Sequence, residues 1–299
     1  MLATLLLLWL LLLPLLLLAA MGGVLATSRL MSSDWQPGFS ELTAKLFIPA
    51  LLFSGAYKNG IPAGLSWQFL AAFYLPLVAL FVISAFAFGR DAPRALAAIY
   101  SNTVFVGIPV LTLAFGADSL QYAFPIIAFH ALVAFSLYYL ARASGPKLLS
   151  SLRNAVNNPI VASLMLGLAC NVLGVALPEA LTGVLSILSA AALPCALLVL
   201  GASLVKFRVR SWPATSLIVL VKLVLLPACV YGLAVFVFGL PAPTTAVLVV
   251  IAACPVGVNA AALVQADGQD PAPVSSAIML SCVACIVTIP VWLGIVRAL

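Results

Sequence analysis

Charged residues are scarce in this chain. Only 7% of its 299 residues are charged, whereas soluble domains carry about 25%. Hydrophobic residues make up 65% of the chain, and apolar runs long enough to span a membrane recur from end to end between short loops. These runs are continuous rather than alternating, which excludes a transmembrane β-barrel. The sequence therefore predicts an all-α polytopic membrane protein that lies in a lipid bilayer.

Acidic residues are rarer still. The chain has 7 of them, in predicted loops or at the ends of predicted spans: Asp34, Glu41, Asp91, Asp118, Glu179, Asp267 and Asp270. Carriers that exchange protons or sodium ions generally use carboxylates buried at membrane depth, so this pattern argues against a cation antiporter and weakens the case for sodium coupling. Uniport, or proton coupling through the substrate, stays open.

Catalytic and metal-binding motifs are lacking as well. The chain has a single histidine, with no nucleophile–base set, phosphate-binding loop or zinc motif around it. Its 6 cysteines all fall in apolar segments, and the Cys282/Cys285 pair lies within a predicted span, so we interpret them as unpaired packing residues. We expect no enzyme, no cofactor and no metal. The net charge of +6 is interpreted by where the basic residues lie, and not as a nucleic-acid signal.

Ten apolar segments fit membrane spans. They cover roughly residues 2–26, 40–57, 65–89, 94–115, 119–142, 155–176, 181–204, 212–239, 243–265 and 272–298. The first could pass for a signal peptide, but no basic residue precedes it and its apolar run is too long, so we interpret it as a span.

Basic residues predict the orientation. If the N-terminus lies outside, the cytoplasmic loops carry Arg29, Arg90, Arg94, Arg142, Lys147, Arg153, Lys206, Arg208 and Arg210, and the outer side carries only Lys58 and Arg297. Basic residues prefer cytoplasmic loops, so both termini are expected outside.

The two halves of the chain are related. Pro49 and Pro194 open similar stretches, and each lies about the same number of residues before a later proline, Pro109 or Pro255. Five spans in each half, 1–148 and 149–299, would place the second repeat upside down in the membrane. Such inverted repeats bind substrate at their interface near the midplane.

Pro109 and Pro255 mark breaks within membrane-length segments, each with glycine and asparagine close by. A proline in a membrane helix is often only a kink. Here the matched positions favour broken helices, which are tolerated only where the backbone lines a protein cavity.

Four motifs resemble the auxin efflux carrier family, whose bacterial members include carriers associated with malonate or malate. They are NTVFVGIPVL at 102–111, NNPI at 157–160, LPCALLVLGASL at 193–204 and CPVGVNAAAL at 254–263. The similarity runs over essentially the whole chain. The plant members differ in having a long hydrophilic loop between spans five and six.

The resemblance implies a fold like that of bile-acid symporters and sodium–proton antiporters. Spans 4 and 9 would be broken and cross between a scaffold domain (spans 1, 2, 6 and 7) and a transport domain (spans 3–5 and 8–10). It also implies that Asn102 and Asn259 line the substrate site and that Pro109 and Pro255 are the crossover prolines.

The expected chemistry is anion binding. The second half of a broken helix begins with unsatisfied N–H groups and a positive dipole end, and two such ends meeting bind an anion without a fixed cation. The candidate substrate-binding residues are Asn102, Thr103, Gly107, Ile108, Pro109, Pro255, Val256, Gly257, Asn259 and Lys222.

Three ionisable residues lie inside predicted spans. Lys45, near the cytoplasmic start of the second span, is expected to extend its amine to the membrane surface. Lys222 is either a countercharge for the substrate, or a substitute for a coupling cation, or it pairs structurally with the carbonyls at a helix C-terminus. His130 either titrates, as part of a charge relay with Lys222, or is a hydrogen-bonded packing residue.

The sequence thus predicts an elevator-type carrier of a small organic anion, such as malonate, malate or an auxin-like acid, in the bacterial inner membrane. A sodium-coupled symporter of the bile-acid type and a non-transporting receptor are the alternatives. The Leu-rich scaffold spans fit a homodimer face as well as they fit lipid.

Overall fold

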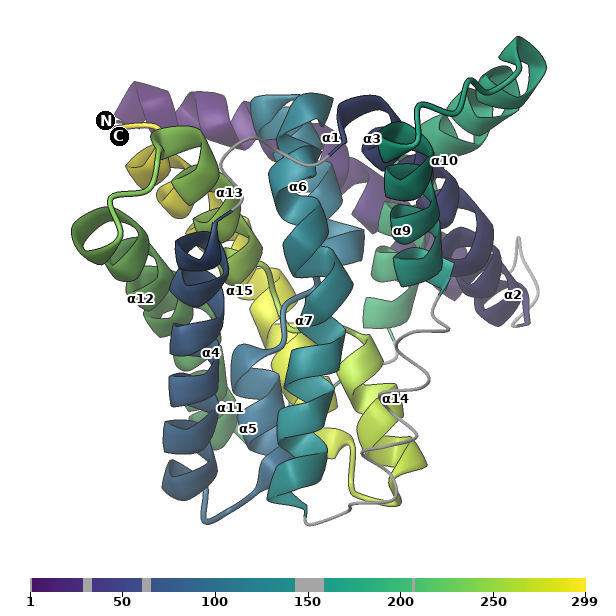
Figure 1. Ribbon diagram of the computed structural model, residues 1–299. Helices are drawn as coiled ribbons and strands as arrows, with labels where there is room; N and C mark the ends of the chain where they lie inside the picture. The colour runs from purple at the N-terminus through teal and green to yellow at the C-terminus, as the bar shows by residue number, and fades with distance from the viewer. Residues whose placement is uncertain (1, 29–33, 61–65, 143–158, 206–207) are drawn as a thin grey trace.

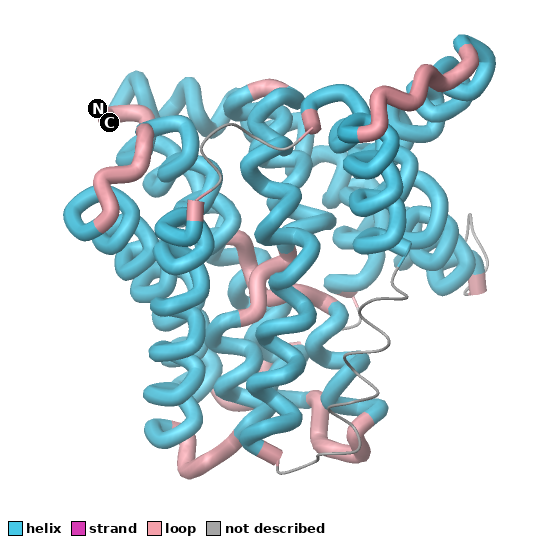
Figure 2. The backbone as a smooth tube through the Cα atoms, in the orientation of Figure 1, coloured by secondary structure: helices cyan, strands magenta, loops and turns pink. Residues whose placement is uncertain are grey.

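The computed structural model describes residues 2–28, 34–60, 66–142, 159–205 and 208–299. Within these ranges the regular structure is helical, with one isolated antiparallel bridge between Ser101 and Val256 (Figure 2). The expectation of an all-α fold is confirmed. Some residues used above lie outside the described ranges, namely Arg29, Lys147, Arg153, Lys206, Asn157 and Asn158.

The helical segments follow the apolar runs of the sequence (Figure 1). In the first half they are α1 (Leu2–Thr27), α2 (Trp35–Leu42), η1 (Thr43–Phe47), α3 (Ile48–Asn59), α4 (Trp67–Ala87), α5 (Ala92–Ile99), η2 (Thr103–Gly107), α6 (Ile108–Phe115), η3 (Ala117–Ser119) and α7 (Leu120–Ala141). In the second half they are α9 (Pro159–Val172), α10 (Glu179–Leu204), α11 (Trp212–Leu220), η4 (Val221–Leu225), α12 (Leu226–Gly232), η5 (Leu233–Val237), α13 (Ala242–Ala253), α14 (Asn259–Ala266) and α15 (Ala272–Val296).

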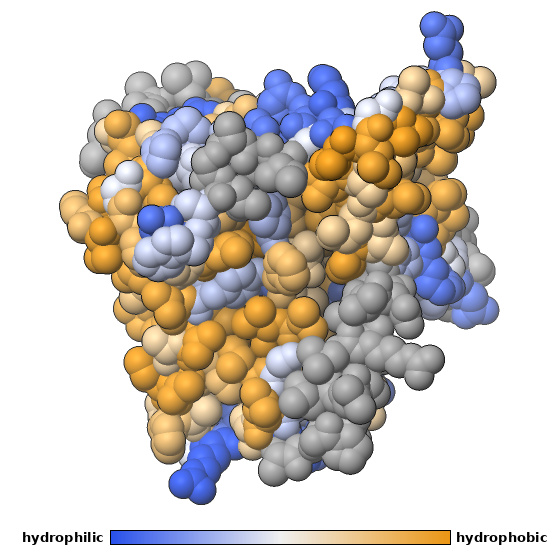
Figure 3. Space-filling model, viewed as in Figure 1, coloured by the Kyte–Doolittle hydropathy of each residue, from blue (hydrophilic) through white to orange (hydrophobic). Residues whose placement is uncertain are grey.

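Among the described residues, six helical runs are long and apolar enough to cross a membrane: Trp35–Asn59, Trp67–Ala87, Ala117–Ala141, Glu179–Leu204, Trp212–Val237 and Ala272–Val296. Shorter apolar helices cover Leu12–Thr27, Thr103–Phe115, Pro159–Val172 and Ala242–Ala253. Apolar side chains dominate the side of the molecule, and polar ones gather at its two ends (Figure 3). These features are those of a multi-pass membrane protein.

Prolines within the helical runs produce π-helical turns at three places. Each of the turns η1, η2 and η4 is followed directly by an α-helix with proline in its first two positions, Pro49, Pro109 and Pro227 respectively. Proline lacks an N–H and its ring crowds the preceding turn, and a wider π turn accommodates both effects without ending the helix. The helix therefore runs on through Pro109.

The helices form two bundles that touch along one interface. In the first bundle (α1, α2, α3, α9 and α10), α1 packs along α10 and α3 along α9. A side chain at Gly201 would overlap the carbonyl of Ala19, and one at Gly167 would overlap the backbone of Phe53. Both helix pairs therefore depend on glycine for their close approach.

The second bundle contains α4–α7 and α11–α15. Its most deeply enclosed element is α13, where every residue from 244 to 253 is buried. Both chain ends lie at one end of the molecule, and the turn between α4 and α5 lies at the opposite end (Figure 1). The crossing of two interrupted helical runs lies near the centre (Figure 2).

Candidate functional site

Two helical runs are interrupted inside the protein, and the interruptions pair with each other. The chain is extended between α5 and η2 and again between α13 and α14. The Asn102 N–H donates to the Pro255 carbonyl at 2.8 Å, and the Gly257 N–H donates to the Tyr100 carbonyl at 3.0 Å. Each break thus satisfies main-chain groups of the other, which broken helices at membrane depth require.

Two side chains satisfy the amides at the centre of this crossing. His130 of α7 accepts the Ser101 N–H through Nε2 at 2.8 Å, and Ser281 of α15 accepts the Val256 N–H through Oγ at 3.0 Å. The His130 ring also stacks on Tyr100, with centroids 5.0 Å apart and planes at 4°. The Nε2 contact agrees with a packing histidine, whereas Nδ1 is buried without a hydrogen-bond partner among the described residues, so a role in a charge relay stays a prediction.

Asn102 caps the second half of the first broken run. Its Oδ1 accepts the Phe105 N–H at 3.1 Å, as an N-cap residue does. Its Nδ2 is buried and has no hydrogen-bond partner among the described residues. An amide donor left unpaired in the interior is costly, so this group is suited to a ligand that brings an acceptor.

The second half of the other broken run begins without a side-chain cap. Val258 is the N-cap of α14 and contributes no side-chain hydrogen bond, and Asn259, the first residue of α14, is exposed. A side chain at Gly257 would overlap the Tyr100 ring, so only glycine fits there. The α14 N-terminus therefore offers uncapped N–H groups beside an exposed amide.

Lys222 lies in the π turn η4 and is fully buried. Its Nζ donates to the carbonyl of Ala252 at 2.5 Å, in the last turn of α13. A cation there compensates the negative end of the α13 dipole. Of the two interpretations of Lys222, the pairing with C-terminal helix carbonyls describes the observed contact.

The structure does not bring all predicted residues to the crossing. Pro109 and Ile108 are buried in the first turn of α6, within a helix that already begins at Thr103. Pro255, in contrast, lies inside its break and pairs with Asn102. The two prolines are therefore not equivalent in space, and the match between them was wrong, because the first break lies at residues 100–102 and Pro109 is accommodated by the η2 turn.

The remaining predicted residues lie at or beside the crossing. Val256 forms the bridge with Ser101. Gly107 faces the second break, because a side-chain Cβ at this position would lie 3.4 Å from Cys254 Sγ and 3.9 Å from Thr103 Cβ. Thr103 itself is buried at the start of η2 and donates its N–H to the Ser101 carbonyl at 2.9 Å.

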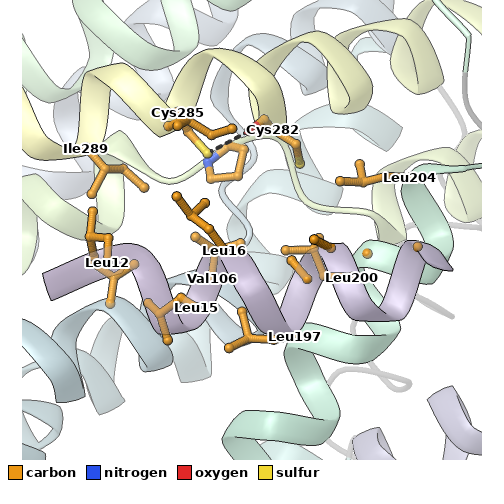
Figure 4. Close-up of a pocket in the computed structure, with 17 residues that line it drawn as sticks. Leu12, Leu15, Leu16, Val106, Leu197, Leu200, Leu204, Cys282, Cys285 and Ile289 are labelled. Atoms are coloured by element: carbon orange, nitrogen blue, oxygen red, sulfur yellow. Dashed lines mark hydrogen bonds between the residues drawn. The ribbon is translucent and has the colours of Figure 1, made fainter. Parts of the chain in front are cut away.

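A cavity of about 460 Å³ lies between the two bundles, next to the crossing (Figure 4). Figure 4 shows Leu12, Leu15 and Leu16 of α1 on one side and Cys282, Cys285 and Ile289 of α15 on the other. Pro255 of the second break and Val106 of η2 also line it. The cavity has the size of a small-molecule site, and its lining is almost entirely apolar.

The buried carboxylate among the described residues lies away from the crossing. Asp267 follows the last turn of α14, accepts from the Tyr138 hydroxyl at 2.8 Å and pairs with Arg142 at 3.3 Å. The other described acidic side chains are not buried. Within the part of the chain that the structure describes, no group of three or more metal-binding side chains occurs.

Sequence reasoning missed Tyr100, Ser101 and Ser281, all of which contact the crossing. Tyr100 covers Gly257 and stacks on His130, Ser101 forms the bridge, and Ser281 accepts the Val256 N–H. The Tyr100-Ser101-Asn102 run at the end of α5 carried a usable signal, because asparagine is a preferred N-cap. Ser281 carried none, since an isolated serine in a membrane helix usually bonds to its own helix.

Comparison with known proteins gives two matches. Residues 142–293 match a protein family described as "Membrane transport protein". A protein from Methanothermobacter thermautotrophicus described as an uncharacterized transporter is 26% identical over 293 residues, covering 93% of this chain and 94% of its own length. Both matches point to a transporter rather than an enzyme.

Proposed function

This chain belongs to the membrane transport protein family, that of the auxin efflux carriers, and on that premise we propose that it carries a small organic anion across the membrane. The anion is a carboxylate bound at the crossing of the two broken runs. The observation that carries this proposal is the buried, unpartnered Nδ2 of Asn102, beside main-chain groups already paired across the crossing.

The electrostatics of the crossing support an anion. Asn102 Nδ2 is a donor, and the α14 N-terminus presents further N–H groups without a side-chain cap. Lys222 lies at the end of α13, where its Nζ donates to the Ala252 carbonyl. Carboxylate oxygens are acceptors, so a carboxylate pairs with these donors without a protein carboxylate competing for them.

The apolar lining of the adjoining cavity favours a monocarboxylate over a dicarboxylate as substrate. Its mostly aliphatic lining offers a second carboxylate no charged partner and only the weak thiol donors of Cys282 and Cys285, and burying an unpaired charge there is costly. An acid with one carboxylate and an apolar body, auxin-like in this sense, fits the crossing and the cavity together. Malonate and malate, which carry charge at both ends, fit less well.

The proposed movement is of the elevator type. The scaffold domain would be spans 1, 2, 6 and 7, and the transport domain spans 3–5 and 8–10, in two inverted five-span repeats (1–148 and 149–299). In support, α1 pairs with α10 and α3 with α9, and both broken runs lie in the other bundle. The interface between the bundles contains the cavity, so a shift of one bundle would carry the bound anion.

The proposal extends to the cellular setting. The chain would lie in the bacterial inner membrane with both termini outside, in keeping with the basic cytoplasmic loops. Exposed leucines on α1, among them Leu10, Leu13 and Leu17, suit contact with lipid or with a second copy through the scaffold domain.

Uptake into proteoliposomes tests the function. Protein reconstituted in a potassium buffer is expected to exchange radiolabelled monocarboxylates with apolar bodies, such as indole-3-acetate, faster than malonate or malate. Asn259→Ala is expected to slow this exchange, and Lys58→Ala, at an exposed lysine in the last turn of α3, is the matched control. The proposal fails if no carboxylate is carried, or if Asn259→Ala leaves exchange unchanged.

The same vesicles distinguish the alternative. A sodium-coupled symporter of the bile-acid type would show uptake that rises steeply with external sodium. We expect uptake to be the same in sodium and potassium, because the Lys222 ammonium already occupies the negative end of α13. A receptor would bind ligand without any flux.

A further inference from the structure

Two cysteines of α15 face the cavity between the bundles. Cys282 and Cys285 are three residues apart and share a helix face with Ile286 and Ile289, which line the same space. Figure 4 shows both thiols on the α15 side of the cavity, opposite the leucines of α1. Cys285 Sγ donates to the Cys282 carbonyl at 3.1 Å, and both thiols are free.

The other cysteine near the crossing is placed differently. Cys254 is fully buried, its Sγ donates to the Val250 carbonyl at 3.2 Å, and it packs against Gly107. It does not line the cavity. Cys170 of α9 is partly exposed and lies outside the cavity. Cys282 and Cys285 thus face the cavity, whereas Cys254 is enclosed and Cys170 is partly exposed elsewhere.

We propose that Cys282 and Cys285 form a covalent modification site for small, uncharged, thiol-reactive electrophiles, and that an adduct there blocks transport. An apolar electrophile partitions into the lipid and then into an apolar cavity of about 460 Å³. The block rests on the proposed function, because the cavity lies where one bundle must move past the other. The chemical modification itself does not depend on it.

The reaction with a maleimide balances without a further reactant. The cysteine sulfur forms a bond to one alkene carbon, the carbon–carbon π bond breaks, and the thiol proton ends on the neighbouring carbon through water. The product is a thioether whose ring occupies part of the cavity. A substrate with an apolar body competes for the same volume.

Labelling of purified protein in lipid nanodiscs with N-ethylmaleimide tests the site. Peptide mapping by mass spectrometry is expected to find adducts on Cys282 or Cys285 in the folded protein and on Cys254 only after denaturation. The Cys282→Ala/Cys285→Ala variant should lose the cavity adduct, whereas Cys170→Ala should retain it. A folded protein whose Cys282 and Cys285 stay unlabelled, yet react after denaturation, overturns the proposal.

A second readout separates this proposal from the function. In proteoliposomes, residual carboxylate exchange is expected to fall in proportion to the labelled fraction of wild type and to stay constant in the double variant. Full labelling with undiminished exchange would overturn the block. Full labelling of a protein that carries no tested carboxylate would instead refute the proposed function and leave the modification site standing. Melting curves show whether the alanine variants are folded.

Discussion

The imidazole of His130 accepts the main-chain N–H of Ser101 at 2.8 Å and ties α7 to the first broken run. Val256 is the bridge partner of Ser101, and its main-chain N–H donates to the hydroxyl oxygen of Ser281 in α15. The amides of the two bridged residues are therefore each held by a side chain from a neighbouring long helix. The crossing is a four-element junction rather than a contact between two loops.

His130→Phe is expected to destabilise the protein. Phenylalanine keeps a ring against Tyr100 but leaves the buried Ser101 N–H unsatisfied, which costs about 1–3 kcal/mol. The melting temperature in detergent should fall. His130→Gln restores an acceptor and should lose less. Equal melting temperatures for His130→Phe and wild type would contradict this account.

Asn102→Asp separates capping from anion binding. Aspartate keeps the oxygen that accepts the Phe105 N–H, so the cap is retained, but it replaces the free Nδ2 with negative charge. We expect a strong loss of carboxylate exchange, together with a lower melting temperature, because the new carboxylate is buried without a partner. Asn102→Ala, which removes cap and donor together, should also lose about 1 kcal/mol of stability. An Asn102→Asp protein that transports normally would show that the amide donor has no role.

Lys222→Met removes a buried ammonium while retaining a chain of similar length. Methionine keeps the packing but leaves the Ala252 carbonyl without its donor, so the protein should lose about 1–3 kcal/mol of stability and its melting temperature should fall. The attraction for the anion should fall, and KM should rise about tenfold for each 1.4 kcal/mol lost. Lys45→Met, at an exposed lysine paired with Glu41, is the matched control. An unchanged KM in Lys222→Met would exclude an electrostatic role.

Gly201→Ala tests the contact of α1 with α10. The new methyl group would overlap the Ala19 carbonyl, so the two helices must separate and the melting temperature should fall. Gly183→Ala lies in the same helix with open space around it, and should be neutral or stabilise by about 0.5–1 kcal/mol. If both variants melt alike, the close approach of α1 to α10 does not matter for stability.

Hydropathy predicted the helical character of the chain and the approximate range of each helical run, because apolar length is a strong signal. It did not predict the π turns, since widening a turn by one residue leaves composition unchanged. The prolines correctly indicated irregular backbone in both runs. In the first run, however, Pro109 lies several residues after the actual break. In that run the break is at residues 100–102, and the helix continues through Pro109 because the π turn η2 accommodates it.

Side-chain roles at the crossing were harder to predict than the crossing itself. Whether His130 titrates or accepts a hydrogen bond depends on which buried N–H lacks a partner, and that depends on the meeting of residues far apart in sequence. Lys222 was placed correctly inside its span. Its carbonyl acceptor, Ala252, became evident only from the packing of η4 against α13.

The contacts between Asn102 and Pro255 and between Gly257 and Tyr100 join peptide groups, which every residue carries. Their geometry consequently survives most replacements of the side chains that project from these two strands of backbone, apart from the glycine. If the crossing binds the substrate as proposed, relatives could change substrate by altering a few projecting side chains while this main-chain pairing stays the same.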